Sequence, residues 1–220
     1  SVSDIAIAMT VFASVLDHAD ARSSMATSLA GIDFMAALDP NALHGVRLGI
    51  VPPDAGLSDE ETLAIFDSTG AVRALQAAGA EVIVVRPDGM PDVDWWQAIT
   101  CGMRDGVNAY LAQNEITDPA SLADIVAIND ANADRYIPLG QARLEEAASC
   151  ELSPNEVSTL TADIMSAARV NLDGVFADYD VDALVTLDDS YSMEYGLAGY
   201  PAITVPRGGY DEMSPTSLTF

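Results

Sequence analysis

Two short apolar runs, separated by a helical pattern, constrain the fold of this chain more than any other feature. The first run, GVRLGIV, covers residues 45–51, and the second, AEVIVVRP, covers residues 80–87; prolines close both. Between them, Ser58 and Glu61 have the spacing of a capping box, and Gly79 suits the end of the helix that follows. A strand, a helix and a strand in about forty residues predict a βαβ crossover, which requires a parallel sheet with helices packed on it.

The rest of the chain continues the same alternation. Periodicity predicts helices over residues 2–16, 94–113, 118–128, 142–148 and 153–179, and strands over residues 181–187, 202–206 and 216–220. Ser3 or Asp4 is the expected cap of the first helix, and residues 188–196 are expected to form a polar loop. We therefore predict one α/β unit over residues 1–220, with a mixed, largely parallel sheet that is covered by helices and incomplete in this chain.

The charge excludes several classes of partner. The chain has 34 acidic and 9 basic residues, a net charge of -25, and every base is arginine. Such a surface repels nucleic acid and anionic membranes, so neither is expected as a partner. A salt-adapted acidic protein is one reading that this charge leaves open. No apolar run reaches the ~18 residues of a membrane span, and no signal peptide is visible, so the compartment stays open with the cytoplasm slightly favoured.

The sequence holds no complete catalytic set. A lysine base is impossible because lysine is absent, and no Gly-x-Ser-x-Gly turn occurs. The two histidines, His18 and His44, suit a helix end and a strand entrance, so a Ser-His-Asp triad is not expected. Cys101 and Cys150 are favoured as two packed thiols, although a single bridge between them stays open.

Metal and cofactor sites are not expected either. The one acidic group beside a strand end, Asp188 and Asp189 with Glu194 nearby, is more typical of a solvated loop than of metal ligands. The segment after residues 45–51 has one glycine and several acids, which do not form a phosphate cradle.

The carboxyl end of the strand at residues 181–187 is the best candidate for a ligand pocket, because open α/β sheets bind ligands at that end of their strands. Tyr191, Met193 and Tyr195 give the following loop apolar and hydrogen-bonding surface, and Gly199 allows a close backbone approach. A loop that only packs on its own core explains these residues equally well.

Several motifs resemble the closing part of the amidase signature family. DYDVDALVTL, LAGYPAITVP and SPTSLTF follow one another as in that family, and LDPNALHGVRLGIV resembles one of its strands. SVSDIAIAMTVFASVLD resembles the helix that follows the catalytic segment, and residues 103–141 resemble the helical insertion of a subgroup that includes bacterial peptide amidases. The chain departs from the pattern where Thr186-Leu187 replaces Pro-Thr and where SPTSLTF has lost glycines.

This resemblance implies an amide hydrolase with a Ser-Ser-Lys catalytic set that lies before the matching region. No catalytic position carries over to this chain, so the catalytic residues are expected in a partner chain or a missing N-terminal segment. The alternatives are a non-catalytic binding or assembly subunit and, more remotely, a periplasmic-type binding protein. A small amide is the expected ligand, and the resemblance and the strand ends together predict this pocket wall: Met103, Thr186, Asp188, Tyr191, Met193, Tyr195, Gly199 and Tyr200.

Overall fold

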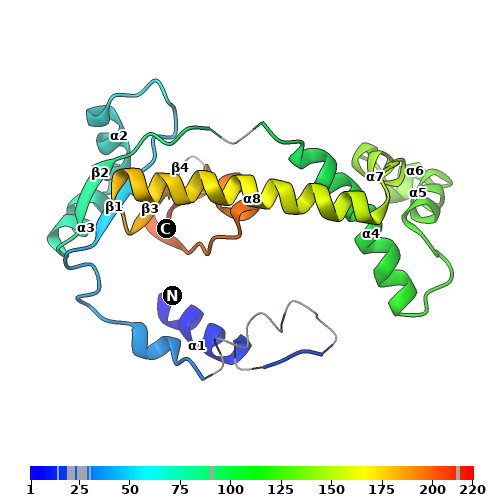
Figure 1. Ribbon diagram of the computed structural model, residues 1–220, viewed down its shortest axis with the longest axis horizontal. Coiled ribbons are helices and arrows are strands. Elements are labelled where there is room, and N and C mark those ends of the chain that lie inside the picture. Colours follow the sequence, from blue (N-terminus) through cyan, green and yellow to red (C-terminus); the bar gives the residue numbers. More distant parts are fainter. Residues whose placement is uncertain (14, 19–22, 24–28, 30, 90–91, 212–213) are drawn as a thin grey trace. The chain divides into compact units, whose positions relative to one another are not determined.

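The computed structural model describes residues 1–13, 15–18, 23, 29, 31–89, 92–211 and 214–220, and these fall into two compact units (Figure 1). The sheet unit comprises residues 1–87, 175–192 and 202–220, and the helical unit comprises residues 88–174 and 193–201. Helix α8 (Pro154–Tyr179) contributes residues to both. The expectation of one α/β unit over residues 1–220 stays a prediction.

Five strands form one mixed sheet in the order β2-β1-β3-β5-β4, which confirms the predicted fold class. The strands are β1 (Arg47–Ile50), β2 (Glu81–Val84), β3 (Ala183–Leu187), β4 (Thr204–Asp211) and β5 (Ser214–Thr219). Strand β1 pairs in parallel with β2 and β3, whereas β5 pairs antiparallel with β3 and β4. The parallel half contains the βαβ crossover that the sequence predicts.

The crossover helix is interrupted, which differs from the single helix expected. It consists of α2 (Asp59–Phe66), the 3-10 turn η3 (Asp67–Thr69) and α3 (Ala71–Ala77). The interruption lies at Gly70, whose φ of 80° is left-handed and therefore suits glycine. The predicted capping box is present: the Ser58 Oγ accepts from the Glu61 N–H, and the Glu61 carboxylate accepts from the Ser58 N–H. The Ser58 N–H and then the Ser58 hydroxyl, which both donate to the Glu61 carboxylate, hold the pKa of Glu61 below its ordinary value.

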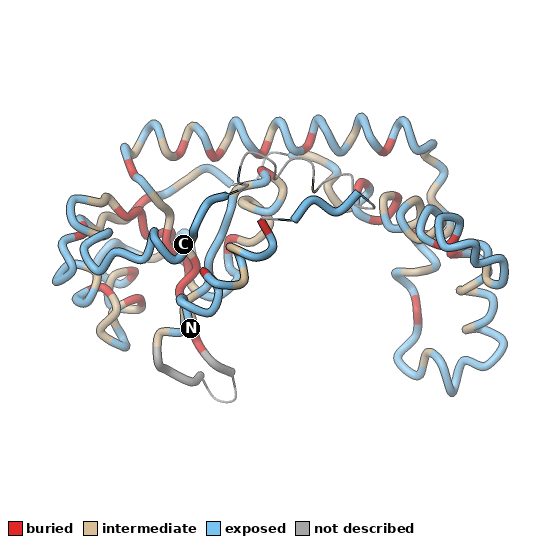
Figure 2. Tube along the Cα trace, turned by 90° about the horizontal axis from the view of Figure 1, so that it is seen from below, coloured by how far each residue is buried: buried red, intermediate tan, exposed pale blue. Residues whose placement is uncertain are grey.

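The main hydrophobic core lies between the strands and this crossover. Figure 2 shows buried residues gathered along the strands of the sheet unit. The buried cluster joins residues of β1, β3 and β5 to residues of the crossover, and its members are Leu48, Ile50, Phe66, Val72, Ala80, Val185 and Leu218.

The helical unit is built from α4 (Trp95–Gln113), α5 (Leu122–Asp130), α6 (Ala133–Tyr136), α7 (Ala142–Ala148) and the first part of α8. Caps predicted at helix starts are present, including Ser121 for α5 and the pair Ser153 and Glu156 at the start of α8. Gln141 is 7% exposed, and its amide bonds Asn129 and Asp130, which ties the start of α7 to α5.

Two local expectations were wrong. Residues 188–196 are not only a polar loop, because helix α9 (Ser192–Ala198) begins inside them. Cys101 and Cys150 are not free thiols but form a disulfide, with their Cα atoms 5.4 Å apart. Arg104, one turn further along α4 than Cys101, donates to the carbonyl oxygens of Cys150 and Leu152, so this segment lies beside α4.

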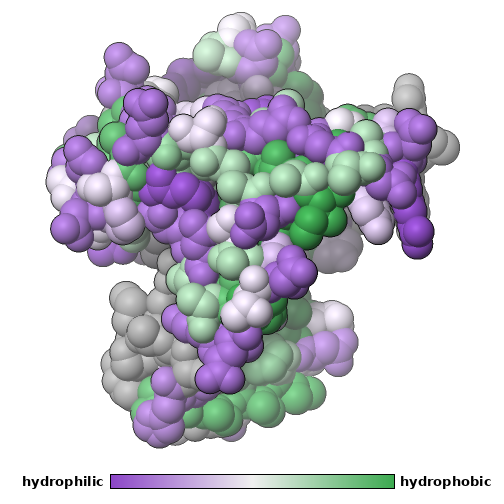
Figure 3. All heavy atoms as spheres, turned by 90° about the vertical axis from the view of Figure 1, so that its right-hand side faces the viewer, coloured by the Kyte–Doolittle hydropathy of each residue, from purple (hydrophilic) through white to green (hydrophobic). Residues whose placement is uncertain are grey.

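Helix α1 (Val2–Phe12) is shorter than predicted, and Ser1 rather than Ser3 or Asp4 caps it. It packs against the 3-10 helix η2 (Phe34–Ala37), and Thr10 bonds the Phe34 N–H. Figure 3 shows apolar side chains on the surface in the lower part of the view, where α1 and η2 lie. Within the described parts of the chain, no helix is long and apolar enough to cross a bilayer.

Candidate functional site

Three threonines lie side by side at the carboxyl end of β3. Thr186 pairs with Thr219, and Thr219 pairs with Thr204, so the three side chains form a row across β3, β5 and β4. The Thr219 hydroxyl lies 3.0 Å from the Thr204 hydroxyl and donates to the Asp188 carbonyl at 2.5 Å. The Thr186 hydroxyl is buried, and no hydrogen-bond partner for it occurs among the described residues.

Asp188 closes the corner between β3 and β5. Its φ of 48° is left-handed, and its carboxylate accepts from the Ser217 N–H at 2.7 Å and from the Ser217 hydroxyl at 2.9 Å. A carboxylate engaged in this way fixes the end of β3. Over the residues that the structure describes, there is no group of three side chains suited to a metal ion.

Tyr191 lies just after this corner and is 8% exposed, so its ring is part of the packed interior of the sheet unit rather than an open wall. Thr186, Asp188 and Tyr191 therefore lie at the end of one strand, as the sequence predicts. Their role in a substrate pocket stays a prediction.

Gly199 and Tyr200 end α9 and hold it to α8. Gly199 has a φ of 70°, and the Tyr200 N–H donates to the Tyr195 carbonyl at 2.9 Å, which closes the helix. The Arg169 Nε donates to the Ala198 carbonyl at 3.1 Å, and the Tyr200 hydroxyl donates to the carboxylate of Asp173. We call the contacts of Arg169 and Asp173 with this segment the clamp. Gly-Tyr-Pro precedes the short strand because the glycine and the tyrosine belong to the end of α9.

Sequence reasoning missed Arg169 and Asp173, the two α8 residues of this clamp. Their spacing of four residues places them on one face of α8, which is the only signal the sequence offers. Met193 and Tyr195 are half-buried on α9, and Met103 is 41% exposed on α4. For these three residues the pocket assignment stays a prediction.

The clamp predicts a pH-dependent contribution to stability. The hydrogen bond to Asp173 is the main cause of a raised Tyr200 pKa, and burial adds to it. A raised folded-state pKa means that the contribution is complete below the ordinary tyrosine pKa of 10.0 and is lost as the pH rises through the folded value. We expect Tyr200→Phe to lower the unfolding free energy by about 1 kcal/mol at pH 8.

Urea denaturation at pH 8 and at pH 11 measures this effect. The difference in unfolding free energy between the unaltered protein and Tyr200→Phe should shrink at pH 11. Asp173→Asn is the matched control, because it keeps an acceptor and removes the charge. A gap that is equal at both pH values would contradict the assignment.

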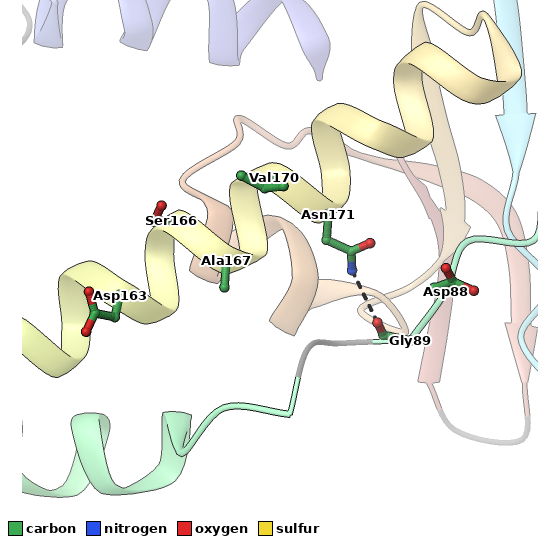
Figure 4. Close-up of a pocket in the computed structure, with 7 residues that line it drawn as sticks. All are labelled: Asp88, Gly89, Asp163, Ser166, Ala167, Val170 and Asn171. Atoms are coloured by element: carbon green, nitrogen blue, oxygen red, sulfur yellow. Dashed lines mark hydrogen bonds between the residues drawn. The ribbon is translucent and has the colours of Figure 1, made fainter.

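The described residues also contain a groove along α8, about 580 Å³ in volume, which the sequence did not predict. Figure 4 shows the Asn171 amide directed toward Gly89, whose carbonyl it reaches at 3.2 Å. Asp163 and Asp88 lie toward opposite ends of the labelled group. The lining residues are Asp88, Gly89, Asp163, Ser166, Ala167, Val170 and Asn171, and none of them is a predicted site residue.

The buried Thr186 hydroxyl predicts an unusual mutational result. An unpaired buried hydroxyl costs free energy, so we expect Thr186→Val, which removes it at nearly constant shape, to raise the unfolding free energy by about 1 kcal/mol. Thr62→Val is the matched control: Thr62 is 0% exposed and donates to the Ser58 carbonyl at 2.8 Å. That variant should lose stability, as measured by urea denaturation. Equal losses in both variants would show that Thr186 is satisfied.

Comparison with known proteins confirms the resemblance. No protein-family model matches the chain. A curated Arabidopsis thaliana protein named "probable amidase" is 27% identical over 186 residues, which is 83% of this chain and 36% of that protein. The chain thus spans about a third of the length of this curated relative.

Solved structures agree. A peptide amidase in complex with the competitive inhibitor chymostatin has a TM-score of 0.80 and 28% identity, covering 100% of this chain and 48% of its own. The native peptide amidase from Stenotrophomonas maltophilia has a TM-score of 0.74 and 26% identity, covering 98% of this chain and 47% of its own. The chain is therefore related to the amidase signature proteins and corresponds to a C-terminal-like part of them.

Proposed function

We propose that this relative of the amidase signature proteins is part of a hydrolase that cleaves carboxamide or peptide-amide C–N bonds. The similarity to a peptide amidase structure over 100% of the chain carries the proposal. In this proposal the chain supplies the sheet and a wall of the substrate pocket. The serine nucleophile, the lysine base and the oxyanion donors come from polypeptide outside these 220 residues, since the chain contains no lysine.

The chemistry assigns a limited task to this chain. An amidase needs a serine oxygen to attack the amide carbon, a base to take its proton and pass it to the leaving amine, and water to release the acyl group. The residues at the end of β3 would position the substrate for that attack. The corner at Asp188 is rigid, since its carboxylate and its carbonyl are both bonded to β5. A rigid strand end suits a positioning role.

The surface of α1 supports the proposed partner polypeptide. Its large apolar side chains remain exposed, and Ala6 is the buried residue within the helix. The exposed fractions include 53% for Ile5, 52% for Ile7, 55% for Val11 and 71% for Phe12. Several large apolar side chains exposed together on one short helix are normally covered by another part of the fold or by a partner. We infer that the part of the relatives' fold that this chain lacks covers α1, from a partner chain or from another segment of the same protein.

Substrate kinetics of the complete protein test this function. We expect hydrolysis of neutral carboxamides or peptide amides, measured as ammonia release, and a changed KM for Tyr191→Ala and Tyr195→Ala. Tyr110→Ala is the control for truncating a tyrosine outside the predicted pocket wall, since Tyr110 is 63% exposed on α4. The unfolding free energy of Tyr191→Ala is measured beside its KM, because Tyr191 is 8% exposed. Unchanged kinetics on several amides would contradict the assignment of both tyrosines to the pocket wall. A complete protein that hydrolyses no amide would refute the proposed hydrolase function.

A non-catalytic binding or assembly subunit is the second candidate. The replacement of Pro-Thr by Thr186-Leu187 at the end of β3 favours it, because this is the strand end nearest to the predicted pocket. Amide binding without ammonia release in the same assay would support this candidate over the hydrolase.

A further inference from the structure

We propose that the disulfide between Cys101 and Cys150 is a redox-controlled crosslink, which stabilises the helical unit when oxidised and loosens it when reduced. We call this crosslink the redox lock. It joins α4 to the connection between α7 and α8 and closes a loop with a sequence separation of 49 residues. Both cysteines and all the residues between them belong to the helical unit, so the lock acts within this unit. The inference does not depend on the proposed hydrolase activity.

The apolar core shared by α4, α5 and α7 is small. Their buried apolar residues are Ala98, Cys101, Leu111, Leu122 and Ala147, of which only the two leucines are large. Small cores of this kind usually need a covalent or metal crosslink for stability. A crosslink that closes a long loop removes much of the conformational freedom of the unfolded segment.

Polar contacts keep the two cysteines close even without the bond. The Arg104 guanidinium donates to the carbonyl oxygens of Cys150 at 2.5 Å and of Leu152 at 2.7 Å, and it pairs with Asp105 at 2.7 Å. This arrangement holds the Cys150 backbone beside α4. The lock can therefore open and close without a search for the partner cysteine.

Closing the lock is a two-electron oxidation. The Cys101 and Cys150 thiols lose two protons and two electrons, and an external disulfide, such as oxidised glutathione or a protein disulfide, takes them and becomes two thiols. Reduction is the reverse exchange. Because disulfides persist in oxidising compartments and are rare in the cytosol, the closed lock favours an oxidising compartment for this chain.

Three acidic residues line a pocket beside the bond. A pocket of about 480 Å³ is lined by both cysteines together with Asp94, Glu146 and Glu151. The Glu146 carboxylate accepts from the Trp96 indole at 2.7 Å, and the Arg143 guanidinium lies 4.1 Å from the Trp96 ring centroid. The three carboxylates outnumber the two nearby guanidinium groups of Arg104 and Arg143, so they should repel a reductant whose net charge is negative. We therefore expect cysteamine, whose ammonium group offsets its thiolate, to reduce the bond faster than anionic glutathione at low salt, and the difference to fall at high salt.

Limited proteolysis with trypsin tests the lock. Arg143 lies on α7 inside the closed loop, whereas Arg73 lies on α3 of the sheet unit with its side chain 75% exposed. The protein is first equilibrated in an oxidising glutathione buffer and treated with a thiol-alkylating reagent. Its intact mass should then show no alkylated cysteine. Reduction should then raise the cleavage rate at Arg143 by roughly 30-fold or more, with no change at Arg73.

The double variant Cys101→Ser with Cys150→Ser should cleave like the reduced protein and should not respond to reductant. If this variant does not fold, thiol alkylation and cleavage of the unaltered protein still decide the question. Two alkylated cysteines in the oxidising buffer, or equal cleavage at Arg143 in both redox states, would overturn the proposal. Equal reduction rates by cysteamine and glutathione at low salt would overturn the part played by the acidic residues.

Discussion

Replacing Phe66 with alanine is expected to lower the unfolding free energy by about 3–5 kcal/mol, the largest effect we expect from a single side chain in the sheet unit. Phe66 is 1% exposed at the end of α2, and it belongs to the cluster that joins α2 and α3 to β1, β3 and β5. Truncation removes a ring from the contact between the crossover and the sheet and leaves a cavity there. Urea denaturation of the full chain, followed by circular dichroism, measures the loss.

Phe12→Ala is the matched control for this prediction. Phe12 is also a phenylalanine at the end of a helix, but it is 71% exposed, so its truncation should change the unfolding free energy by about 0.5 kcal/mol or less. Similar losses in the two variants would mean that the crossover is not packed on the sheet as described. A loss confined to Phe66→Ala supports the βαβ core on which the proposed function depends.

The parts of the fold that were predicted correctly are those with local causes. The capping pairs at Ser58 and Ser153 involve residues three positions apart, and the buried residues of α8 from Ile164 to Val175 repeat every three or four positions. Apolar runs closed by prolines indicated the positions of β1 and β2. Each of these features is decided by neighbours in sequence, so a single sequence is enough to find them.

The wrong expectations have distant causes. Helix α9 contains Gly196 and is short, and the side chains that hold its end to α8 come from Arg169 and Asp173. The pairing of Cys101 with Cys150 depends on contacts across the helical unit, and two isolated cysteines have no spacing that predicts it. Neither feature could be derived from a local pattern.

The antiparallel half of the sheet was underestimated for a third reason. The strand predicted at residues 202–206 was expected to stop at Pro206, but β4 continues to Asp211, and β5 begins at Ser214. So short a connection allows only an antiparallel pair. The pairing shifts in register between Pro206 and Tyr210, where proline and glycine replace ordinary strand residues. The proline and glycines inside β4 therefore made the sequence predict a strand that is too short.

The second large effect is expected at Gly49, in the middle of β1. A Cβ atom at this position would lie 2.9 Å and 3.1 Å from the two Cγ atoms of Val85 and 3.2 Å from Leu184. Val85 is 0% exposed, and β1 is hydrogen-bonded to strands on both sides. Neither the Val85 side chain nor β1 itself can therefore move aside without a cost in free energy. We expect Gly49→Ala to lower the unfolding free energy by about 1–3 kcal/mol in urea denaturation, as overpacked cores do.

Two further variants decide whether the crowding with Val85 is the cause. Adding Val85→Ala to Gly49→Ala removes both Cγ atoms, so the double variant should lose less stability than the sum of the single changes. Gly102→Ala is the control for glycine itself: it lies inside α4, where an added Cβ would have no atom within 4 Å, and it should gain about 0.5–1 kcal/mol from helix propensity. Strictly additive losses at Gly49 and Val85 would refute this packing. Coupling between them would place β1 and the residue after β2 in contact on the face of the sheet opposite Leu48 and Ile50, since neighbouring strand residues alternate between faces.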